Sequence, residues 1–521
     1  MLLSGLGALV LFGCYYRQSR TVVVRSDGGS VALQAWDMLH GNLLLRHWHM
    51  SDVSFWCTEL VQYALLEAVH GLGPGVVHLG GAMTYTLLLV LAAGLARGRT
   101  GDTSRPQALV RVLIVAVVMV APAAAASPTL LLTPDHLGSA VPVLLAWLAV
   151  DRLAPLTGGR PALRWLLPVL VLLLLAWGQV ADDLVLLTGA VPLAVTTGIR
   201  AIVRRRTSPA GPLPWLEVSL ATAAAASAGL ARGAEVLIRV SGGYGLQPVA
   251  TRITRPDELP HVAKLTVEGL TTLFGVPPTA AHTRSELVFA LAHLPGLVAV
   301  AIAVLLALTR LGRSNDLVVP GLAVAIVVNV AAFVITPYAQ NLLSAREMAA
   351  VLPFGAVLAG RQLAGPLLRV RVRPALWAAL AAVLAANLAA LGYHAAQPAR
   401  PADHQALANW LVTHRLTAGL ATDYWVANST TLDAGGRVTV RQVSIDRNWR
   451  LEPPTTWGNR SDWYDPDHYR ATFIVVDDAK PGAWTAEWWS AVRTFGRPAR
   501  TLHPDGYTVL VWHRNLLAAI R

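Results

Sequence analysis

Acidic, basic and amide side chains stand in four short polar segments of an otherwise apolar sequence. Their sequences are RSDGGS, TPDHLG, VADDLV and TPYAQNLLSAREMAAVLPF. A carboxylate can act as a general base, and a guanidinium can bind an anion through paired hydrogen bonds. The candidate site residues from these segments are Asp27, Asp135, His136, Asp182, Asp183, Tyr338, Gln340, Asn341, Arg346 and Glu347.

A structural role competes with a functional one at most of these positions. Asp182 and Asp183 precede a predicted helix, where carboxylates suit the helix N-terminus. Arg346 and Glu347 could form a pair with each other. For Asp27 a functional role is favoured over a structural one, because Gly28 and Gly29 follow it and leave the backbone open to a ligand.

The composition predicts a polytopic α-helical membrane protein. Hydrophobic residues make up 54%, charged residues 14%, and the mean hydropathy is +0.50; soluble proteins carry about 25% charged residues. Blocks such as VLIVAVVMVAPAAAA and LLPVLVLLLLAW approach the roughly 20 residues that cross a bilayer. We expect about eleven spans, at 1–16, 74–96, 109–126, 137–150, 165–178, 184–203, 215–232, 286–309, 318–336, 346–364 and 375–393.

The basic residues predict how these spans are oriented. Five short connections hold sixteen arginines, whereas the three alternate connections 127–136, 179–183 and 337–345 hold no lysine or arginine. Lysine and arginine near span ends are retained in the cytoplasm. The N-terminus is therefore expected to be cytoplasmic, and the candidate residues to lie outside. The net charge of +12 comes largely from the arginines of these connections, so it does not indicate a nucleic-acid partner.

The pattern along the chain predicts two domains. A transmembrane domain at 1–394 carries outside loops at 17–73 and 241–285, the first with amphipathic helices. Residues 395–521 alternate helical and strand patterns, which predicts a soluble extracytoplasmic α/β domain. Cys14, Cys57 and the histidines of the first loop show no metal-ligand spacing, so no metal site is assigned.

Three motifs resemble the GT-C superfamily, membrane glycosyltransferases that use polyprenyl-phosphate sugars and include protein O-mannosyltransferases and aminoarabinose transferases. Asp27 after the first span, followed by Gly28, Gly29 and the MLHG at 38–41, resembles their first outside loop. SPTLLLTPDHLGSAVPVLLAW resembles their second outside loop, and AREMAAVLPFGAVLAG resembles the start of a late span. The resemblance covers most of residues 1–393. Family members often carry two adjacent acids in the first loop, whereas Gly28 follows Asp27 here. The resemblance therefore does not decide whether a divalent metal is required. It also leaves open the alternative that the protein is an inactive descendant of such an enzyme.

The resemblance implies an inverting glycosyltransferase, and the Arg- and Ala-rich composition indicates a high-GC bacterium, so we expect it in the bacterial plasma membrane, acting on the cell envelope. The sugar would pass from a polyprenyl-phosphate donor to an extracytoplasmic protein, glycan or lipid acceptor, beside membrane lipids and without nucleic acid. Asp27 would be the general base, Arg346 would bind the departing phosphate, and Asp135 and His136 would border the donor or orient the acceptor.

Two other functions compete with sugar transfer. A transporter or lipid flippase would show repeat symmetry, broken spans in matching positions and ionisable groups near the bilayer midplane. An inactive membrane scaffold would keep the same fold without chemistry. The ionisable groups of this sequence gather at one face, which favours the glycosyltransferase.

Overall fold

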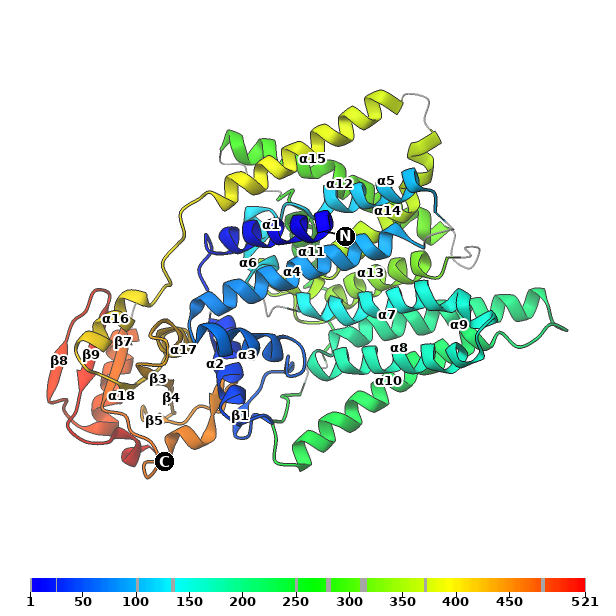
Figure 1. Cartoon of the computed structure of the whole chain (residues 1–521). Coiled ribbons are helices and arrows are strands. Elements are labelled where there is room, and N and C mark those ends of the chain that lie inside the picture. The colour runs from blue at the N-terminus through cyan, green and yellow to red at the C-terminus, as the bar shows by residue number, and fades with distance from the viewer. Residues whose placement is uncertain are drawn as a thin grey trace. The chain divides into compact units, whose positions relative to one another are not determined.

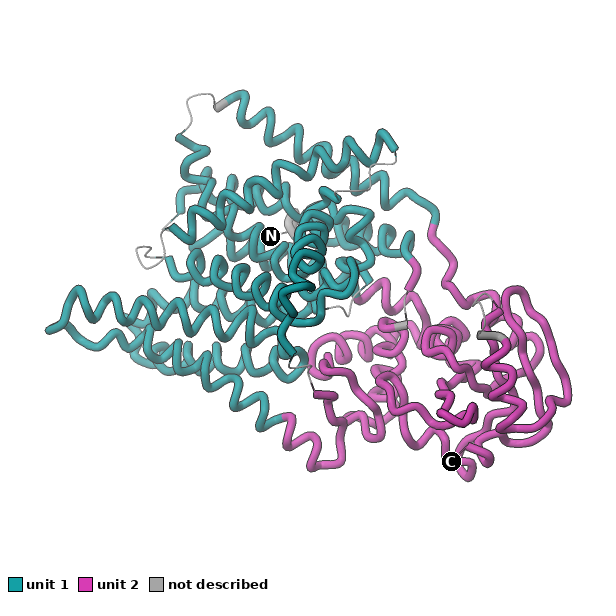
Figure 2. Tube along the Cα trace, turned by 180° about the vertical axis from the view of Figure 1, so that it is seen from behind, with its two compact units in different colours: residues 1–22, 81–234, 250–398 teal, residues 23–80, 235–249, 399–521 magenta. Residues whose placement is uncertain are grey.

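The computed structural model describes residues 2–24, 26–99, 103–132, 136–248, 252–277, 283–309, 316–369, 373–478 and 483–520. The chain forms two compact units, drawn in different colours in Figure 2. Unit 1 comprises 1–22, 81–234 and 250–398, and unit 2 comprises 23–80, 235–249 and 399–521.

Unit 1 is built from helices, most of them long and packed side by side (Figure 1). Their bounds are α1 Leu2–Ser19, α4 Pro74–Arg97, α5 Arg105–Met119, η1 Ala124–Ala126, α6 Ser127–Leu130, η2 Leu137–Ser139, α7 Ala140–Leu153, η3 Ala154–Gly158, α8 Pro161–Ala181, η4 Leu186–Ala190, α9 Val191–Thr207, α10 Trp215–Val240, α11 Leu259–Leu273, α12 Arg284–Thr309, α13 Val318–Ile335, η5 Leu342–Met348, α14 Val351–Arg369 and α15 Arg373–Ala395. Helices α4 and α10 begin or end in unit 2.

The helices confirm a multi-pass membrane protein. Within the described residues, eight helices are long and apolar enough to span a membrane, or nine if the bent pair α5 with η1–α6 is one span. The other two predicted spans, 1–16 and 215–232, also fall on helices, α1 and α10. The ends of α4, α7 and α9 and the starts of α5, α10 and α13 line one pocket, so these arginine-rich connections lie at the same helix ends. These ends, at 97–105, 153–161, 207–215, 309–318 and 369–373, are called the arginine-rich end below.

The third predicted span, 109–126, is not one straight helix. Helix α5 ends at Met119, and the chain bends by 75° into η1 and α6. Pro122 lies in the break, where it lacks an N–H and cannot continue the helical ladder.

The break frees backbone carbonyls in an apolar environment, and side chains from other helices satisfy them. Four consecutive carbonyls each accept one bond: Met119 from Tyr85 Oη (2.7 Å), Val120 from Tyr15 Oη (2.9 Å), Ala121 from His293 Nε2 (2.8 Å) and Pro122 from Gln18 Nε2 (2.6 Å). An unsatisfied backbone group costs several kcal/mol in hydrocarbon, so these bonds make the bend tolerable.

Unit 2 contains a five-stranded mixed sheet in the order β3-β2-β7-β9-β8, and this confirms the predicted C-terminal α/β fold. Strand β2 is parallel to β3 and β7, and β9 is antiparallel to β7 and β8. The elements are α16 Gln405–Thr413, β2 Ala418–Ala421, α17 Tyr424–Asp433, β3 Thr439–Gln442, β7 Phe473–Asp477, α18 Ala483–Phe495, β8 Arg500–Leu502, β9 Tyr507–Val511 and η7 Leu516–Ala519. Alternate residues of β7 enter two different apolar clusters, so both faces of the sheet are covered.

The first loop packs within unit 2 as well. It forms α2 Ser26–Leu39 and α3 Glu59–His70, and its short strand β1 Trp48–His49 pairs with β6 Asn459–Arg460. The Asp37 carboxylate accepts bonds from Trp48 Nε1 (2.8 Å) and from Arg460 Nη1 (2.7 Å). The remaining short elements are β4 Ser444–Ile445, β5 Leu451–Glu452 and η6 Ser461–Tyr464.

We predict that Gly81→Ala destabilises the protein while Gly94→Ala does not. Both glycines lie in α4, but a Cβ at Gly81 would come 2.1 Å from the Leu131 carbonyl oxygen, and a Cβ at Gly94 would meet nothing within 4 Å. Overpacking against a backbone costs about 1–3 kcal/mol or more. Thermal unfolding of the purified protein in detergent measures both variants, and an unchanged Tm for Gly81→Ala would contradict this close approach.

Candidate functional site

His136 is buried between two carboxylates in unit 1. Its Nδ1 lies 2.9 Å from Asp182 Oδ2, and its Nε2 lies 3.2 Å from Glu347 Oε1. The residue takes a left-handed conformation with φ 57°, immediately before η2 and α7. Its backbone carbonyl also accepts the Ser139 hydroxyl. Three connections that are far apart in sequence therefore meet at one imidazole, at the end of the helices opposite the arginine-rich end.

Asp182 and Asp183 are adjacent in the sequence, but their carboxylates contact different residues. Asp182 is 2% exposed, and its Oδ1 accepts the Leu184 backbone N–H at 2.9 Å while its Oδ2 holds His136. It is thus both a helix cap and a member of the cluster. Asp183 pairs instead with Arg232 of α10 at 2.6 Å.

Glu347 and Arg346 are positioned by the short helix η5. Asn341 starts this helix as its N-cap, with its side chain accepting the Leu343 N–H at 2.9 Å and Ser344 completing a capping box. Near the end of η5, Arg346 Nε lies 3.8 Å from Glu347 Oε1, so the predicted pair is present but loose. The Arg346 side chain is 36% exposed, whereas that of Glu347 is 19% exposed.

The remaining predicted residues lie outside this cluster or outside the described residues. Tyr338 is half-buried and Gln340 is exposed, in the connection before η5. Asn341 has the capping role already given. Asp135 falls outside the described residues.

Asp27 belongs to unit 2, in the first turn of α2, where it is half-buried. The two glycines after it do not leave the backbone open. A Cβ at Gly28 would lie 3.0 Å from Val77 Cγ1, and one at Gly29 would lie 3.7 Å from Leu432. Their small size serves close packing of α2, so the argument from open glycines was wrong, and the role of Asp27 depends on the family resemblance.

Sequence reasoning missed Asn329, which supports the cluster from inside a span. Its Nδ2 donates to the Glu347 backbone carbonyl at 2.9 Å, and the residue is 1% exposed in α13. The signal was present, because a single asparagine interrupts the apolar run VVPGLAVAIVVNVAAFVI. Polar residues at such depth are costly and usually serve a specific contact.

The two acids keep the His136 imidazole charged. Burial alone would lower the pKa of His136, but the charges of Glu347 and Asp182 and the hydrogen bonds to both raise this pKa well above its ordinary value. Burial raises the pKa of Glu347, and the His136 and Arg346 charges outweigh it, leaving this pKa below its ordinary value. The cluster therefore favours the charged imidazolium form of His136 and the ionised form of Glu347.

This arrangement suits positioning more than metal binding. Both ring nitrogens of His136 face carboxylates, so neither is directed at a shared point with them. Within the part of the chain that the structure describes, no group of three His, Cys, Asp or Glu residues could hold a metal ion. The cluster can instead fix η5, and with it Arg346, against the start of α7.

The fold of this chain is similar to that of a solved crystal structure. No protein family model matches the sequence, and no curated protein matches it either. The crystal structure of ArnT from Cupriavidus metallidurans, bound to undecaprenyl phosphate, is similar over 98% of this chain and 97% of ArnT, with a TM-score of 0.53 and 13% sequence identity. The chain therefore has an ArnT-like fold, and the predicted polytopic helical architecture is confirmed.

We predict that His136→Gln lowers stability by about 3–5 kcal/mol, because it leaves the buried Asp182 and the partly buried Glu347 without the imidazolium between them. The raised pKa of His136 gives a stabilisation that is fully present below about pH 6.5 and is lost as pH rises through the folded-state value. The difference in Tm between wild type and variant should therefore shrink from pH 6 towards alkaline pH.

The control is His261→Gln, which replaces an exposed histidine of the same unit. It should leave the pH profile of Tm unchanged. A wild-type advantage over His136→Gln that stays constant or grows with pH would rule out the charged imidazole.

Proposed function

We propose that this chain is a plasma-membrane glycosyltransferase that transfers a sugar from a polyprenyl-phosphate donor to an acceptor outside the cytoplasm. The observation that carries the proposal is the fold similarity, over nearly the whole length, to an ArnT structure that holds undecaprenyl phosphate. The motifs around Asp27, His136 and Arg346 support the same reading from the sequence.

The proposed reaction is a single displacement with inversion. The acceptor hydroxyl oxygen attacks the anomeric carbon of the sugar from the side opposite the phosphate. The bond from this carbon to the phosphate oxygen breaks, and its electron pair stays on the lipid phosphate. Asp27 accepts the hydroxyl proton, a step that typically contributes about 10²–10⁴-fold in rate.

Arg346 is the proposed binding group for the lipid phosphate. A guanidinium donates paired hydrogen bonds to phosphate oxygens and stabilises the negative charge left on them. Glu347 lies beside Arg346 and is itself held by His136, at 3.2 Å, and through its backbone by Asn329. Groups fixed in this way before the ligand arrives cost little entropy on binding.

The proposed orientation places the cluster of His136, Asp182 and Glu347 away from the cytoplasm. Sixteen arginines mark the opposite helix ends, and arginine near span ends is retained in the cytoplasm. The N-terminus would then be cytoplasmic and residues 395–521 extracytoplasmic. A donor with its polyprenyl tail in the bilayer would present its sugar at the level of this cluster.

We predict that Asp27→Asn lowers the rate of sugar transfer by about 10²–10⁴-fold, because the amide cannot accept the hydroxyl proton. The assay follows release of undecaprenyl phosphate from undecaprenyl-phosphate sugars in proteoliposomes, with cell-envelope extract as acceptor. Asp257→Asn is the control, since Asp257 is 69% exposed and pairs only with nearby Arg255 among the described residues. Undiminished transfer by Asp27→Asn would remove Asp27 as the base, and no transfer by wild type would favour an inactive scaffold.

We predict that Arg346→Gln raises the Kd for undecaprenyl phosphate about tenfold or more, the effect of losing a hydrogen bond to a charged group. Arg346→Lys keeps the charge but loses the planar fork, so an intermediate Kd is expected. Arg284→Gln is the matched control: it removes an exposed arginine at the start of α12. Equal Kd values for Arg346→Gln and Arg284→Gln would count against Arg346 as the phosphate ligand.

A further inference from the structure

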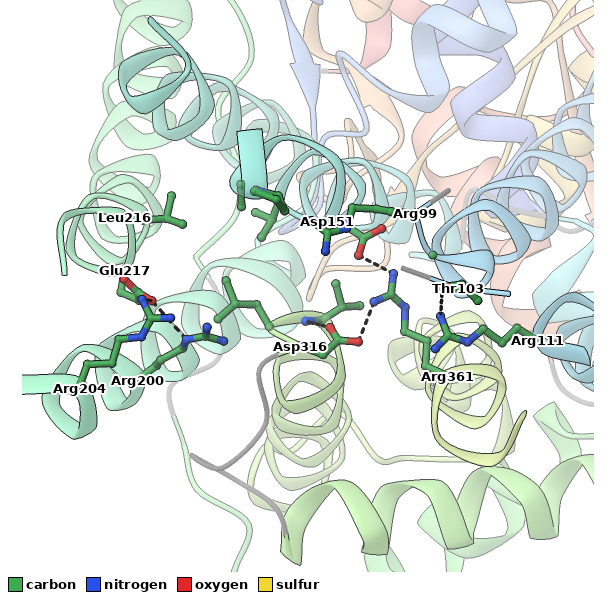
Figure 3. Close-up of a pocket in the computed structure, with 16 residues that line it drawn as sticks. Arg99, Thr103, Arg111, Asp151, Arg200, Arg204, Leu216, Glu217, Asp316 and Arg361 are labelled. Carbon is green, nitrogen blue, oxygen red and sulfur yellow. Dashed lines mark hydrogen bonds and ion pairs between the residues drawn. The ribbon is translucent and has the colours of Figure 1, made fainter. Parts of the chain in front are cut away.

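A polar pocket of about 450 Å³ lies at the arginine-rich end of unit 1 (Figure 3). Its volume is within the range of about 300–1,000 Å³ that is usual for small-molecule sites. It lies among the ends of α4, α5, α7, α9, α10 and α13 and the later part of α14. Five guanidinium groups and three carboxylates line it, from Arg99, Arg111, Arg200, Arg204, Arg361, Asp151, Glu217 and Asp316.

One part of the lining is a closed structural network. Arg361 is 8% exposed and contacts Asp151 at 2.7 Å and Asp316 at 2.8 Å. Its Nε also donates to the Leu95 carbonyl at 2.9 Å. These bonds engage the guanidinium, so Arg361 holds helices together and is not the group that needs a ligand.

A second part shares one carboxylate between two cations. Arg200 Nε lies 3.2 Å and Arg204 Nη1 lies 2.6 Å from the same Glu217 oxygen, and Glu217 is 2% exposed. Two guanidinium groups on one carboxylate leave a positive charge there. Arg204 is half-exposed, so it can reach a further anion from this position.

Arg111 is the least satisfied cation of the pocket. Its Nε is buried and has no hydrogen-bond partner among the described residues. Its Nη1 makes only long contacts, 3.4 Å to Thr103 Oγ1 and 3.5 Å to the Ala96 carbonyl. Of the carboxylates in the described ranges, none forms an ion pair with it. Gly98, at φ 74°, makes room for this group, because a Cβ there would lie 2.6 Å from Arg111 Nη1.

We propose that this pocket binds a phosphate-bearing anion through Arg111 and Arg204. The lining carries more positive than negative charge, and Arg111 has donors that no described group uses well. Guanidinium groups match phosphate oxygens in geometry and charge. Two sources carry this chemistry: the headgroup of an anionic phospholipid in the adjoining leaflet, and a water-soluble phosphate.

The site is separate from the proposed transfer chemistry, which is at the opposite helix ends. The anion-binding proposal can therefore be tested independently of the sugar-transfer proposal. By the positive-inside rule, the pocket would face the cytoplasm, so the phosphate-bearing anion would come from the cytoplasm or the cytoplasmic leaflet.

The test is the thermal stability of the purified full chain in detergent, titrated at constant ionic strength. One arm adds sodium pyrophosphate, and the other adds phosphatidylglycerol, with phosphatidylcholine as its neutral comparison. We expect at least one of the two anions to raise Tm by roughly 3 °C or more at saturation. A rise with phosphatidylglycerol alone identifies a lipid headgroup, and a rise with pyrophosphate identifies a soluble phosphate; both support the site.

The variants Arg111→Gln and Arg204→Gln should each weaken the response, with the midpoint of the titration raised about tenfold or more. Arg206→Gln is the control, since Arg206 lies on the same helix end but is not part of the lining. If Arg111→Gln fails to fold, Arg111→Lys keeps the charge, and a weaker response is still expected. No rise in wild type with either anion, or equal midpoints in Arg111→Gln, Arg204→Gln and Arg206→Gln, would overturn the proposal.

Discussion

The Arg361 guanidinium is buried in α14 between the carboxylates of Asp151 and Asp316 and the carbonyl of Leu95. A charge in an apolar layer costs several kcal/mol unless partners compensate it, and removing one partner is strongly destabilising. Because the partners come from α4, from α7 and from the start of α13, this network fixes four helices against one another at one end. The opposite ends of α7 and α14 begin next to His136 and Glu347, so the position of the His136 cluster depends on the same helices.

A second constraint is the break after Met119. The bend is possible only because Tyr15, Gln18, Tyr85 and His293 supply bonds to the freed carbonyls. Close contact of Gly81 with the Leu131 carbonyl then fixes the segment after the bend. The geometry of the site is therefore built by residues that do not belong to it.

The hydrophobic periodicity and the composition of the sequence predicted much of the fold. Long apolar runs fixed the number and place of most spans, and the alternating pattern after residue 395 predicted an α/β domain, but not the mixed order of its strands. The bend in the third span was not predicted, because Pro122 lies inside an alanine-rich run that reads as continuous helix. A hydropathy profile reports only how apolar a segment is. It cannot show which backbone carbonyls will accept a hydrogen bond from a tyrosine that is distant in the sequence.

The candidate site was predicted in part. His136, Asp182 and Glu347 were all named from the sequence, but their contacts were not, since His136 and Glu347 are 211 residues apart in the chain. Asn329 was missed because one amide hardly changes the hydropathy of a span. The glycines after Asp27 were misinterpreted, because small residues serve close packing as readily as ligand access, and only the neighbours Val77 and Leu432 distinguish the two.

The pairing of β1 with β6 joins residue 48 to residue 460 within unit 2. During synthesis, α2 leaves the ribosome roughly four hundred residues before helix α17, which packs against it. Expression of residues 399–521 alone would omit β1, the partner of β6, and α2, the partner of α17, so this part of unit 2 cannot form all of its contacts without residues 26–49.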